Sequence, residues 1–386
     1  MNINIFGSTG YIGSKSLNLI NTFYPNYKIN LLVANSNYKK LILQVKKYKP
    51  KAIYLNDKSK IQYLKKKINK KINIIEHNKL SEYLYNSKSN LTILSISGYQ
   101  SLNYLEAIIN NTSNLGLVNK ECVVSAGHLF KSLFNKNKIK IFPLDSEHFS
   151  LHRHIKIMNS NDFSEIYLTA SGGPFYKKKF NDIKNVSFKN AINHPKWKMG
   201  YKNSIDSSTL ANKCLEIIEA HYLFDIPYSK INAIIHTKAL IHSIINFSDH
   251  TSQLNYFYHD MEIPILNFLN SVNYKKKLTD IYINNNYKFK YPDNLDFDII
   301  NLNLYPIYKI FLKLDKNNPK EIIKFNLCNE FAVELFKNNK IGFGDIHKII
   351  NNSLSIHINN SVNSIENVIK FQTKYNNSLK KKYEYL

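Results

Sequence analysis

The sequence predicts an α/β protein in three parts, because strand and helix patterns alternate from the first residues and give way to helical patterns near the end. Short apolar runs typical of buried strands alternate with helical apolar spacing over residues 1–143. Strands and helices are also mixed over residues 144–270, which predicts an α+β domain, whereas residues 301–386 predict a helical bundle. Residues 271–300 are rich in Asn, Lys and Tyr and lack periodicity, so we interpret them as a linker.

A glycine turn joins the first predicted strand to the first helix. Residues 2–6 alternate in polarity, Gly7, Gly10 and Gly13 follow, and residues 16–20 have helical apolar spacing. Glycines at this spacing allow a tight turn and let backbone N–H groups approach a pyrophosphate at a helix N-terminus. This pattern predicts a Rossmann-like dinucleotide-binding domain; a glycine turn that only packs strand against helix is the alternative.

Further strands are predicted at residues 29–34, 52–55, 92–96 and 116–118. The first of these ends in Asn35, Ser36 and Asn37, where the adenosine ribose of a dinucleotide would lie. No acidic residue is present there, which argues against an NAD-type contact to the ribose and leaves room for a 2′-phosphate. Lys39 and Lys40 can neutralise such a phosphate.

Asn119, Lys120 and Glu121 directly follow the strand predicted at residues 116–118. Ligands of open α/β sheets bind at the carboxyl ends of the strands, so these side chains are candidates for a binding site. A charged helix start is the alternative, and the residues themselves leave both open.

Asp145, Ser146, Glu147 and His148 form an acidic cluster in a chain dominated by Lys, Asn and Ile. If the stretch is extended, Asp145 and Glu147 share one face and Ser146 points the other way. Two carboxylates this close favour a hard divalent ion such as Mg²⁺ or Mn²⁺. A solvated turn with a helix N-cap is the alternative.

The central part carries a second charged segment. Strands are predicted at residues 165–169, 233–235 and 240–247, in a mixed sheet, and residues 207–209 are predicted to cap a helix over residues 210–224. Asn212 and Glu216 lie one turn apart on that helix, with Lys213 beside them. They can supply a third carboxylate to a metal and an ammonium to a phosphate. An exposed amphipathic helix would show the same pattern.

Histidines and the single tryptophan mark other segments. His194 and Trp197 lie in a polar, lysine-rich stretch that we interpret as a mobile lid, although the histidine can also belong to an ordinary surface. His236 and His242 lie on apolar strands and are more typical of packed side chains. The C-terminal part predicts helices at residues 307–314, 332–336 and 346–354.

The formal net charge of +25 reflects a bias that runs along the whole chain. Arg153 is the single arginine among 53 basic residues, whereas nucleic-acid readout favours arginine, so we expect no nucleic-acid partner. The three cysteines are far apart, which predicts neither a disulfide framework nor a zinc site. Without a long apolar run or a signal segment, we expect a cytoplasmic protein with no membrane partner.

Taken together, these segments closely resemble the 1-deoxy-D-xylulose 5-phosphate reductoisomerase family, in the order in which that family carries them. The segments are residues 7–13, 119–121, 144–148, 171–175, 194–200, 206–216, 326–330 and 343–346. The resemblance implies a homodimeric enzyme that uses NADPH and one divalent cation (Mg²⁺, Mn²⁺ or Co²⁺). It further implies that the enzyme acts on a sugar phosphate, making 2-C-methyl-D-erythritol 4-phosphate in non-mevalonate isoprenoid biosynthesis.

The resemblance also implies roles for the residues at matching positions. The metal ligands would be Asp145, Glu147 and Glu216. The substrate-binding residues would be Lys120, Ser146, Glu147, Ser171, His194, Ser207, Asn212, Lys213 and Glu216. The catalytic residues would be Lys120, Asp145, Glu147, His194 and Glu216. The cofactor-binding residues would be Thr9, Gly10, Tyr11, Ile12, Asn37, Asn119, Glu121 and Gly200.

The chain departs from the family pattern near the cofactor. Asn35 and Ser36 replace the usual glycine and basic residue, which puts strict NADPH preference in doubt, and Cys214 replaces a glycine. Two other functions are kept as alternatives. One is another Rossmann-fold oxidoreductase, of the semialdehyde or homoserine dehydrogenase type; the other is a basic nucleic-acid-binding protein.

Overall fold

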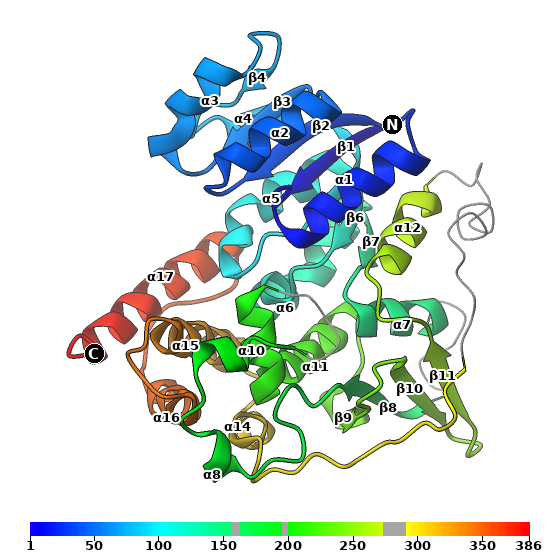
Figure 1. Cartoon of the computed structure of the whole chain (residues 1–386), viewed down its shortest axis with the longest axis vertical. Coiled ribbons are helices and arrows are strands. Elements are labelled where there is room, and N and C mark those ends of the chain that lie inside the picture. The colour runs from blue at the N-terminus through cyan, green and yellow to red at the C-terminus, as the bar shows by residue number, and fades with distance from the viewer. Residues whose placement is uncertain (156–162, 195–199, 273–290) are drawn as a thin grey trace. The chain divides into compact units, whose positions relative to one another are not determined.

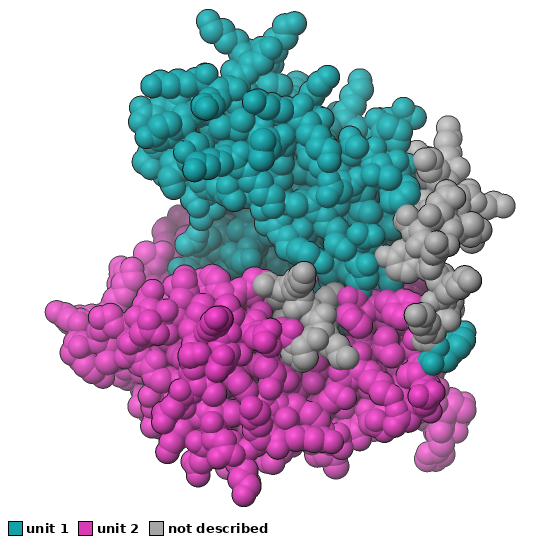
Figure 2. Space-filling view, in the orientation of Figure 1, with its two compact units in different colours: residues 1–119, 131–149, 260–291 teal, residues 120–130, 150–259, 292–386 magenta. Residues whose placement is uncertain are grey.

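The computed structural model describes residues 1–155, 163–194, 200–272 and 291–386 (Figure 1). The chain divides into two compact units, which Figure 2 colours separately. Unit 1 comprises residues 1–119, 131–149 and 260–291, and unit 2 comprises residues 120–130, 150–259 and 292–386. Neither unit is continuous in the sequence.

Unit 1 is built on a seven-stranded sheet in which all neighbouring strands are parallel. Its strands are β1 (Asn2–Phe6), β2 (Lys28–Ala34), β3 (Ala52–Leu55), β4 (Asn73–Ile74), β5 (Ser89–Leu94), β6 (Thr112–Leu117) and β7 (Lys140–Pro143). The order β4-β3-β2-β1-β5-β6-β7 reverses direction beside β1, as in doubly wound folds. The predicted Rossmann-like sheet is confirmed.

The helices of unit 1 connect these parallel strands (Figure 1). They are α1 (Tyr11–Phe23), α2 (Tyr38–Tyr48), α3 (Ile61–Lys67), α4 (Leu80–Asn86) and α5 (Leu102–Asn111). Unit 1 also contains α12 (Glu262–Ser271), which connects none of these strands. Helix α12, far along the chain, packs against α1. Lys15 of α1 binds Asp260 and Glu262 at 2.8 and 3.0 Å, and the Tyr27 hydroxyl donates to the Leu269 carbonyl at 3.2 Å.

Unit 2 contains the predicted mixed sheet, with the order β11-β10-β8-β9. Its strands are β8 (Phe163–Ala170), β9 (Ile231–Ile235), β10 (Ile241–Phe247) and β11 (Ser252–Tyr256). Strands β8 and β9 are parallel, whereas β10 is antiparallel to both of its neighbours. Helix α11 (Ala211–Phe224) packs against β8 and β9, so it presents its residues above this sheet.

Helices α6 (Lys120–Asn137) and α7 (Ser146–Ile155) each contain residues of both units. Helix α6 starts in unit 2, and α7 starts in unit 1 and ends in unit 2. The later part of α7 is attached to the mixed sheet, because the Ser150 and Ser243 hydroxyls lie 2.5 Å apart. Both helices carry predicted site residues in their first turn: Lys120 and Glu121 on α6, and Ser146 and Glu147 on α7.

The C-terminal helices pack around α15 (Pro319–Lys337), which contacts both α16 (Ile346–Leu354) and α17 (Ile365–Lys382). The remaining helices of unit 2 are α8 (Phe180–Ile183), α9 (Phe188–Ala191), α10 (Tyr201–Thr209) and α14 (Pro306–Lys313). Helix α17 was not predicted, because its surface is rich in Lys and Asn. Its buried residues nevertheless recur at helical spacing: Ile365, Val368, Phe371, Tyr375 and Leu379.

The predicted cap of α11 is wrong. Residues 207–209 do not precede this helix as an N-cap; they end helix α10. Leu210, with φ of 60°, joins the two helices directly and is the residue at the N-cap of α11. The Thr209 hydroxyl donates back to the Ile205 carbonyl at 3.1 Å, inside its own helix. A single left-handed residue between two helices leaves no polar signal in the sequence.

Among the described residues, none of the helices combines the length and the apolar character that a bilayer crossing needs.

Candidate active site

The glycine turn of unit 1 lies where the strand order reverses. Gly7 has φ of 82°, and the N–H groups of Gly7 and Ser8 both donate to the Val33 carbonyl. A Cβ atom on Gly7 would lie 2.5 Å from the Ser95 carbonyl oxygen, and one on Gly13 would lie 2.3 Å from the Gly7 carbonyl oxygen. These two glycines are therefore required by packing. A Cβ on Gly10 would lie no closer than 3.2 Å to any atom, so close packing alone does not explain this glycine.

The residues predicted to bind the cofactor in unit 1 gather around this turn. Tyr11 and Ile12 begin α1, Gly10 is its N-cap and Thr9 precedes the cap. The first N–H groups of a helix have no partner within it and suit an anionic ligand. Asn37 is the N-cap of α2, since its side-chain oxygen accepts from the Lys40 N–H at 3.1 Å.

Asn119 is held inside unit 1 at the end of β6. Its side-chain amide donates to the Ile96 and Gly98 carbonyls, and its oxygen accepts from the Ser101 hydroxyl at 2.9 Å. The side chain is only 3% exposed. Asn119 therefore fixes the loop that follows β5. A cofactor that contacts the Asn119 side chain has to use the same amide and oxygen that already bind this loop.

Lys120, the first residue of α6, combines the two interpretations of this segment: it is both a charged helix start and a residue at a strand's carboxyl end. Its ammonium binds Glu216 at 2.8 Å and donates to the Asn212 side chain at 2.9 Å. Glu216 also accepts from Asn212 and Lys213 of its own helix. Lys120, Lys213 and Glu216 are each less than 5% exposed. The alternative of an exposed amphipathic helix is therefore wrong, because this face of α11 is a buried cluster of paired charges.

Three of the residues that the resemblance implies for substrate binding, Ser171, His194 and Ser207, meet in unit 2. The His194 Nε2 atom lies 3.0 Å from the Ser171 hydroxyl and 3.1 Å from the Ser207 hydroxyl. Ser171 comes from the end of β8 and Ser207 from α10, so residues distant in sequence converge on one histidine. Hydroxyls and an imidazole grouped in this way suit a phosphate oxygen.

The loop that carries Ser171 is held by residues from the C-terminal part of the chain. Gly172 and Gly173 have φ of 80° and 67°, and the Gly172 carbonyl accepts from the buried Tyr305 hydroxyl at 2.8 Å. The Phe175 ring packs edge-on against the Phe343 ring at 5.3 Å. Tyr305, which sequence reasoning missed, therefore supports the geometry of Ser171.

Tyr305→Phe is expected to raise the KM for a phosphorylated substrate about 5-fold, because the Gly172 carbonyl loses its donor and the loop loosens by ~1 kcal/mol. Steady-state kinetics would measure this. Tyr308→Phe is the matched control, since Tyr308 is also buried and lies on α14, three residues further along the chain. Equal KM values for the two variants would contradict the role of Tyr305.

The acidic cluster is not extended, so the prediction that Asp145 and Glu147 share a strand face is wrong. Strand β7 ends at Pro143 and helix α7 begins at Ser146. Asp145 acts as the N-cap, because its Oδ1 atom accepts from the Glu147 N–H at 3.3 Å. The N-cap alternative therefore holds together with the predicted carboxylate grouping. The Ser146 hydroxyl donates to the Glu147 carboxylate at 2.5 Å.

Asp145, Glu147 and Glu216 each offer one carboxylate oxygen, and these atoms all lie within 4.8 Å of one another. Asp145 and Glu147 come from the start of α7 and Glu216 from α11. Three carboxylates with hard oxygen donors fit a divalent cation such as Mg²⁺ or Mn²⁺. A cation there shares Glu216 with the ammonium groups of Lys120 and Lys213.

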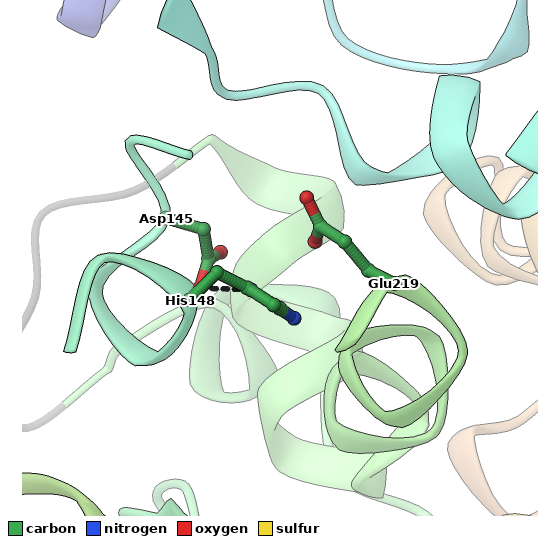
Figure 3. A group of neighbouring side chains, drawn as sticks. All are labelled: Asp145, His148 and Glu219. Atoms are coloured by element: carbon green, nitrogen blue, oxygen red, sulfur yellow. Dashed lines mark hydrogen bonds and ion pairs between the residues drawn. The ribbon is translucent and has the colours of Figure 1, made fainter. Parts of the chain in front are cut away.

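A second group of the same kind shares Asp145. Figure 3 shows Asp145 and His148 at the start of α7 with Glu219 of α11, and one ligand atom from each lies within 4.8 Å of the others. His148 Nδ1 lies 3.3 Å from Asp145 Oδ1, and His148 and Glu219 are fully buried. Sequence reasoning missed Glu219. Its signal was the three-residue spacing from Glu216, which places both on one face of the helix.

Glu121 and Gly200, both predicted to bind the cofactor, lie in unit 2. Gly200 is the N-cap of α10, and Glu121 on α6 pairs with Lys202 at 3.0 Å. Burial opposes ionisation of Glu121, but the attraction of Lys202 outweighs it and lowers the pKa of this carboxyl. Lys202 also binds Asp206 at 2.6 Å.

Glu330 of α15 completes this group of acids. Removal from water, together with the Glu121 and Asp206 carboxylates, raises the pKa of Glu330 to about 8 against the attraction of Lys202. The folded protein therefore keeps this proton up to about pH 8, whereas the unfolded chain releases it near the ordinary value of 4.5. The stability that the proton contributes is complete below the unfolded value and is lost as the pH rises through the folded one.

Glutamine does not titrate, so Glu330→Gln is expected to remove this loss of stability. The difference in melting temperature, variant minus wild type, should increase between about pH 5 and pH 8 and stay constant above pH 8. Thermal unfolding across this range would measure it. Glu334→Gln, one turn along the same helix with 46% of its side chain exposed, is the control. Parallel curves for wild type and Glu330→Gln would contradict the raised pKa.

The other singled-out residues have structural partners or lie outside the described residues. His236 Nδ1 lies 2.9 Å from the Asp296 carbonyl, and the His242 ring stacks on Phe257 at 4.0 Å, as expected for packed histidines. Trp197 and most of the predicted lid fall within residues 195–199, outside the described part of the chain.

A parallel sheet whose order reverses beside a glycine turn, together with three carboxylates grouped for a hard cation, defines a Rossmann-fold enzyme of the metal-dependent oxidoreductase class. Family models narrow this class. The 1-deoxy-D-xylulose 5-phosphate reductoisomerase model matches residues 3–127, the C-terminal domain model of that enzyme matches residues 141–224, and a second DXP reductoisomerase C-terminal domain model matches residues 258–377. The chain belongs to the 1-deoxy-D-xylulose 5-phosphate reductoisomerase family.

Curated relatives and solved structures agree with this assignment. The reductoisomerase of Thermoanaerobacter pseudethanolicus is 33% identical over 98% of both chains, and that of Pelagibacter ubique is 37% identical over 89% of this chain and 88% of its own. A DOX-P reductoisomerase solved with NADPH, fosmidomycin and magnesium is 27% identical, with a TM-score of 0.88 over 100% of this chain and 98% of its own. The Zymomonas mobilis enzyme with NADPH is 28% identical, with a TM-score of 0.84 over 100% of this chain and 99% of its own.

These matches confirm the resemblance seen in the sequence. The dehydrogenase alternative and the nucleic-acid-binding alternative are both disfavoured, because family models of one enzyme account for most of the chain.

Proposed function

We propose that this protein converts 1-deoxy-D-xylulose 5-phosphate to 2-C-methyl-D-erythritol 4-phosphate with NADPH and one divalent cation. The observation that carries the proposal is the grouping of the Asp145, Glu147 and Glu216 carboxylates in a member of this family. Solved relatives have been described with NADPH and with magnesium, which supports the choice of cofactors.

In this proposal Asp145, Glu147 and Glu216 hold the cation, which, when bound, polarises the two adjacent substrate oxygens as a Lewis acid. Lys120 and Ser146 contact those oxygens. Lys120 is suited to this because its ammonium already lies 2.8 Å from Glu216. The Lys120 charge can then stabilise negative charge that develops on a substrate oxygen during the rearrangement.

The phosphate end of the substrate would be bound by Ser171, His194, Ser207, Asn212 and Lys213. The contacts in the structure support this, since His194 joins the two serines and Lys213 lies on the face of α11 that carries Glu216. A fixed phosphate orients the reacting carbons toward the nicotinamide, and orientation of this kind is a large part of catalysis. The cofactor would be bound by Thr9, Gly10, Tyr11, Ile12, Asn37, Asn119, Glu121 and Gly200.

Purified protein supplied with 1-deoxy-D-xylulose 5-phosphate, Mg²⁺ and NADPH is expected to oxidise the cofactor, measured by loss of NADPH absorbance. Removal of the divalent cation with EDTA should stop the reaction, and added Mg²⁺ should restore it. Absence of turnover in correctly folded protein would refute the proposed function, whereas turnover that persists in EDTA would refute the metal dependence alone.

The preference of this protein for NADPH over NADH is expected to be weaker than that of an enzyme with a basic residue after β2. Asn35 and Ser36 carry no charge that could bind the 2′-phosphate. Lys39 and Lys40, at the start of α2, are the nearby cations on this element. The ratio of kcat/KM for NADPH and NADH measures the preference. Ser36→Lys should increase the ratio about 10-fold through one added charge contact; an unchanged ratio would show that this position does not face the phosphate.

We also propose a division of the chain into domains. Residues 1–143 bind NADPH, residues 144–270 provide catalysis and dimerisation, residues 271–300 are a linker, and residues 301–386 form the helical domain.

A homodimer is supported by the edge strand β11, on which Leu254 is 40% exposed. Light scattering would test it, and a monomeric mass at assay concentration would refute it. A cytoplasmic location is supported by the buried free thiols of Cys122, Cys214 and Cys328.

A further inference from the structure

One lysine outside the predicted site connects two of its parts. Lys202 lies on α10, and only 12% of its side chain is exposed. Its ammonium binds Glu121 of α6 at 3.0 Å and Asp206 of its own helix at 2.6 Å. Asp206 in turn accepts from the Asn329 amide of α15 at 2.8 Å. Helices α6, α10 and α15 are therefore joined through one buried ammonium and its two carboxylates.

Each of the two carboxylates is adjacent in sequence to a residue proposed to bind substrate. Glu121 follows Lys120 in the first turn of α6, and Lys120 binds Glu216 and Asn212 of α11. Asp206 precedes Ser207, whose hydroxyl lies 3.1 Å from His194. Since neighbours on a helix point in different directions, fixing Glu121 and Asp206 on one side fixes the backbone that presents Lys120 and Ser207 on another.

The charges make Lys202 difficult to replace. Glu121 is 5% and Asp206 1% exposed at the side chain, so both carboxylates depend on a nearby cation. Without the ammonium they repel each other, and Glu330 adds a third acid to the same group. The helix segments that carry these acids would then separate or rotate, and displacement of about 1 Å is enough to reduce catalysis on the order of 100-fold.

We infer that Lys202 is a positioning residue for the proposed reaction, acting through Glu121 on Lys120 and through Asp206 on Ser207. The inference rests on the proposed function. Lys202 touches neither substrate nor cofactor in this scheme. It holds two substrate-binding side chains, from two different helices, at a fixed separation.

Lys202→Met is expected to lower kcat/KM about 100-fold, because Met keeps the length of the side chain and removes the charge. Lys202→Arg keeps the charge in a different shape and should recover activity to within about 10-fold of the wild type. Amide hydrogen exchange should become faster over residues 120–124 in Lys202→Met, which reports the loosened start of α6 without any ligand.

Lys324→Met is the matched control. Lys324 has 5% of its side chain exposed and pairs at 2.8 Å with Glu321 on α15, whose side chain is 28% exposed, so its loss also breaks an ion pair of a buried lysine. This variant should lose thermal stability while kcat/KM and exchange over residues 120–124 stay within about 2-fold of the wild type. Lys202→Met behaving like Lys324→Met in both measurements would overturn the inference.

The route through Glu121 is tested by Glu121→Gln, which keeps the Lys202 and Asp206 pair and is expected to fold even if Lys202→Met does not. Glu121 is also proposed to contact the cofactor, so the comparison is made on kcat at saturating NADPH. There its loss of activity should not add to that of Lys202→Met in the double variant, because both remove the same link. Fully additive losses would overturn this route. Inactive wild-type protein would refute the proposed function, and hydrogen exchange would then still decide the role of Lys202.

Discussion

Glu216→Gln is expected to lower kcat about 10³-fold while leaving NADPH binding intact, because the change removes one charged ligand of the cation and ~4 kcal/mol of transition-state stabilisation. Glu216 is also the shared partner of Lys120 and Lys213, so its loss leaves two buried ammonium groups without their carboxylate. Steady-state kinetics at saturating Mg²⁺ and fluorescence titration with NADPH would measure the two effects separately.

The loss of buried ion pairs in this variant should also lower its melting temperature, so folding must be checked. Glu366→Gln is the control, because Glu366 forms a helical ion pair with Lys370 at 2.6 Å but has 75% of its side chain exposed. It should retain wild-type kcat. Glu216→Gln with normal kcat and normal Mg²⁺ dependence would refute the assignment of Glu216 as a metal ligand.

Gly7→Ala is expected to destabilise the fold on the order of 3 kcal/mol and to weaken NADPH binding at least 10-fold. The added Cβ atom would lie 2.5 Å from the Ser95 carbonyl oxygen, and φ of 82° is strained for alanine. Both effects arise at the turn between β1 and α1. If Ser95 at the end of β5 stays in place, this turn has to move to make room for the added Cβ atom. Chemical denaturation and nucleotide titration would measure them.

Gly200→Ala is the control for the destabilisation. Gly200 has φ of −63°, and among the described residues no heavy atom lies within 4 Å of the place that a Cβ atom would take. Alanine should therefore leave the free energy of unfolding of this variant within about 0.5 kcal/mol of the wild type. Equal stability of Gly7→Ala and Gly200→Ala would show that the turn tolerates a side chain, and the close approach to Ser95 would then have no energetic importance.

The sequence alone was sufficient where a residue's chemistry and its local pattern agree. Gly7 and Gly13 predicted a tight turn, and both glycines are required by the packing of that turn. Asn212 and Glu216 predicted one helix face, and both side chains bind the same ammonium of Lys120. In these cases the information is local, because helix spacing and turn geometry are set by residues close in the chain.

The sequence was insufficient where polar residues fill buried positions. Strands β5 and β6 start at Ser89 and Thr112, earlier than the apolar runs at residues 92–96 and 116–118 predicted. The Ser89 hydroxyl donates to that of Thr112 at 3.0 Å, and Thr92 donates to it as well. Because these hydroxyls satisfy one another across the strands, the positions are buried without being apolar. Hydropathy patterns cannot detect this.

Contacts between distant segments were the other limit. Tyr305 supports Gly172 through a bond that spans 133 residues, and Lys202 reaches Glu121 on another helix. Neither residue carries a local motif. Their importance follows only from the fold, since a buried tyrosine or lysine has to find a partner wherever the chain brings one.

The packing of α12 on α1 has a consequence for how the protein is made. Lys15 and its partner Asp260 are 245 residues apart, yet both belong to unit 1. During synthesis from the N-terminus, the first helix is available long before the segment that covers it has left the ribosome. Unit 1 therefore cannot complete its packing in sequence order during synthesis, and the face of its first helix that α12 covers stays without that cover until residues 260–271 arrive.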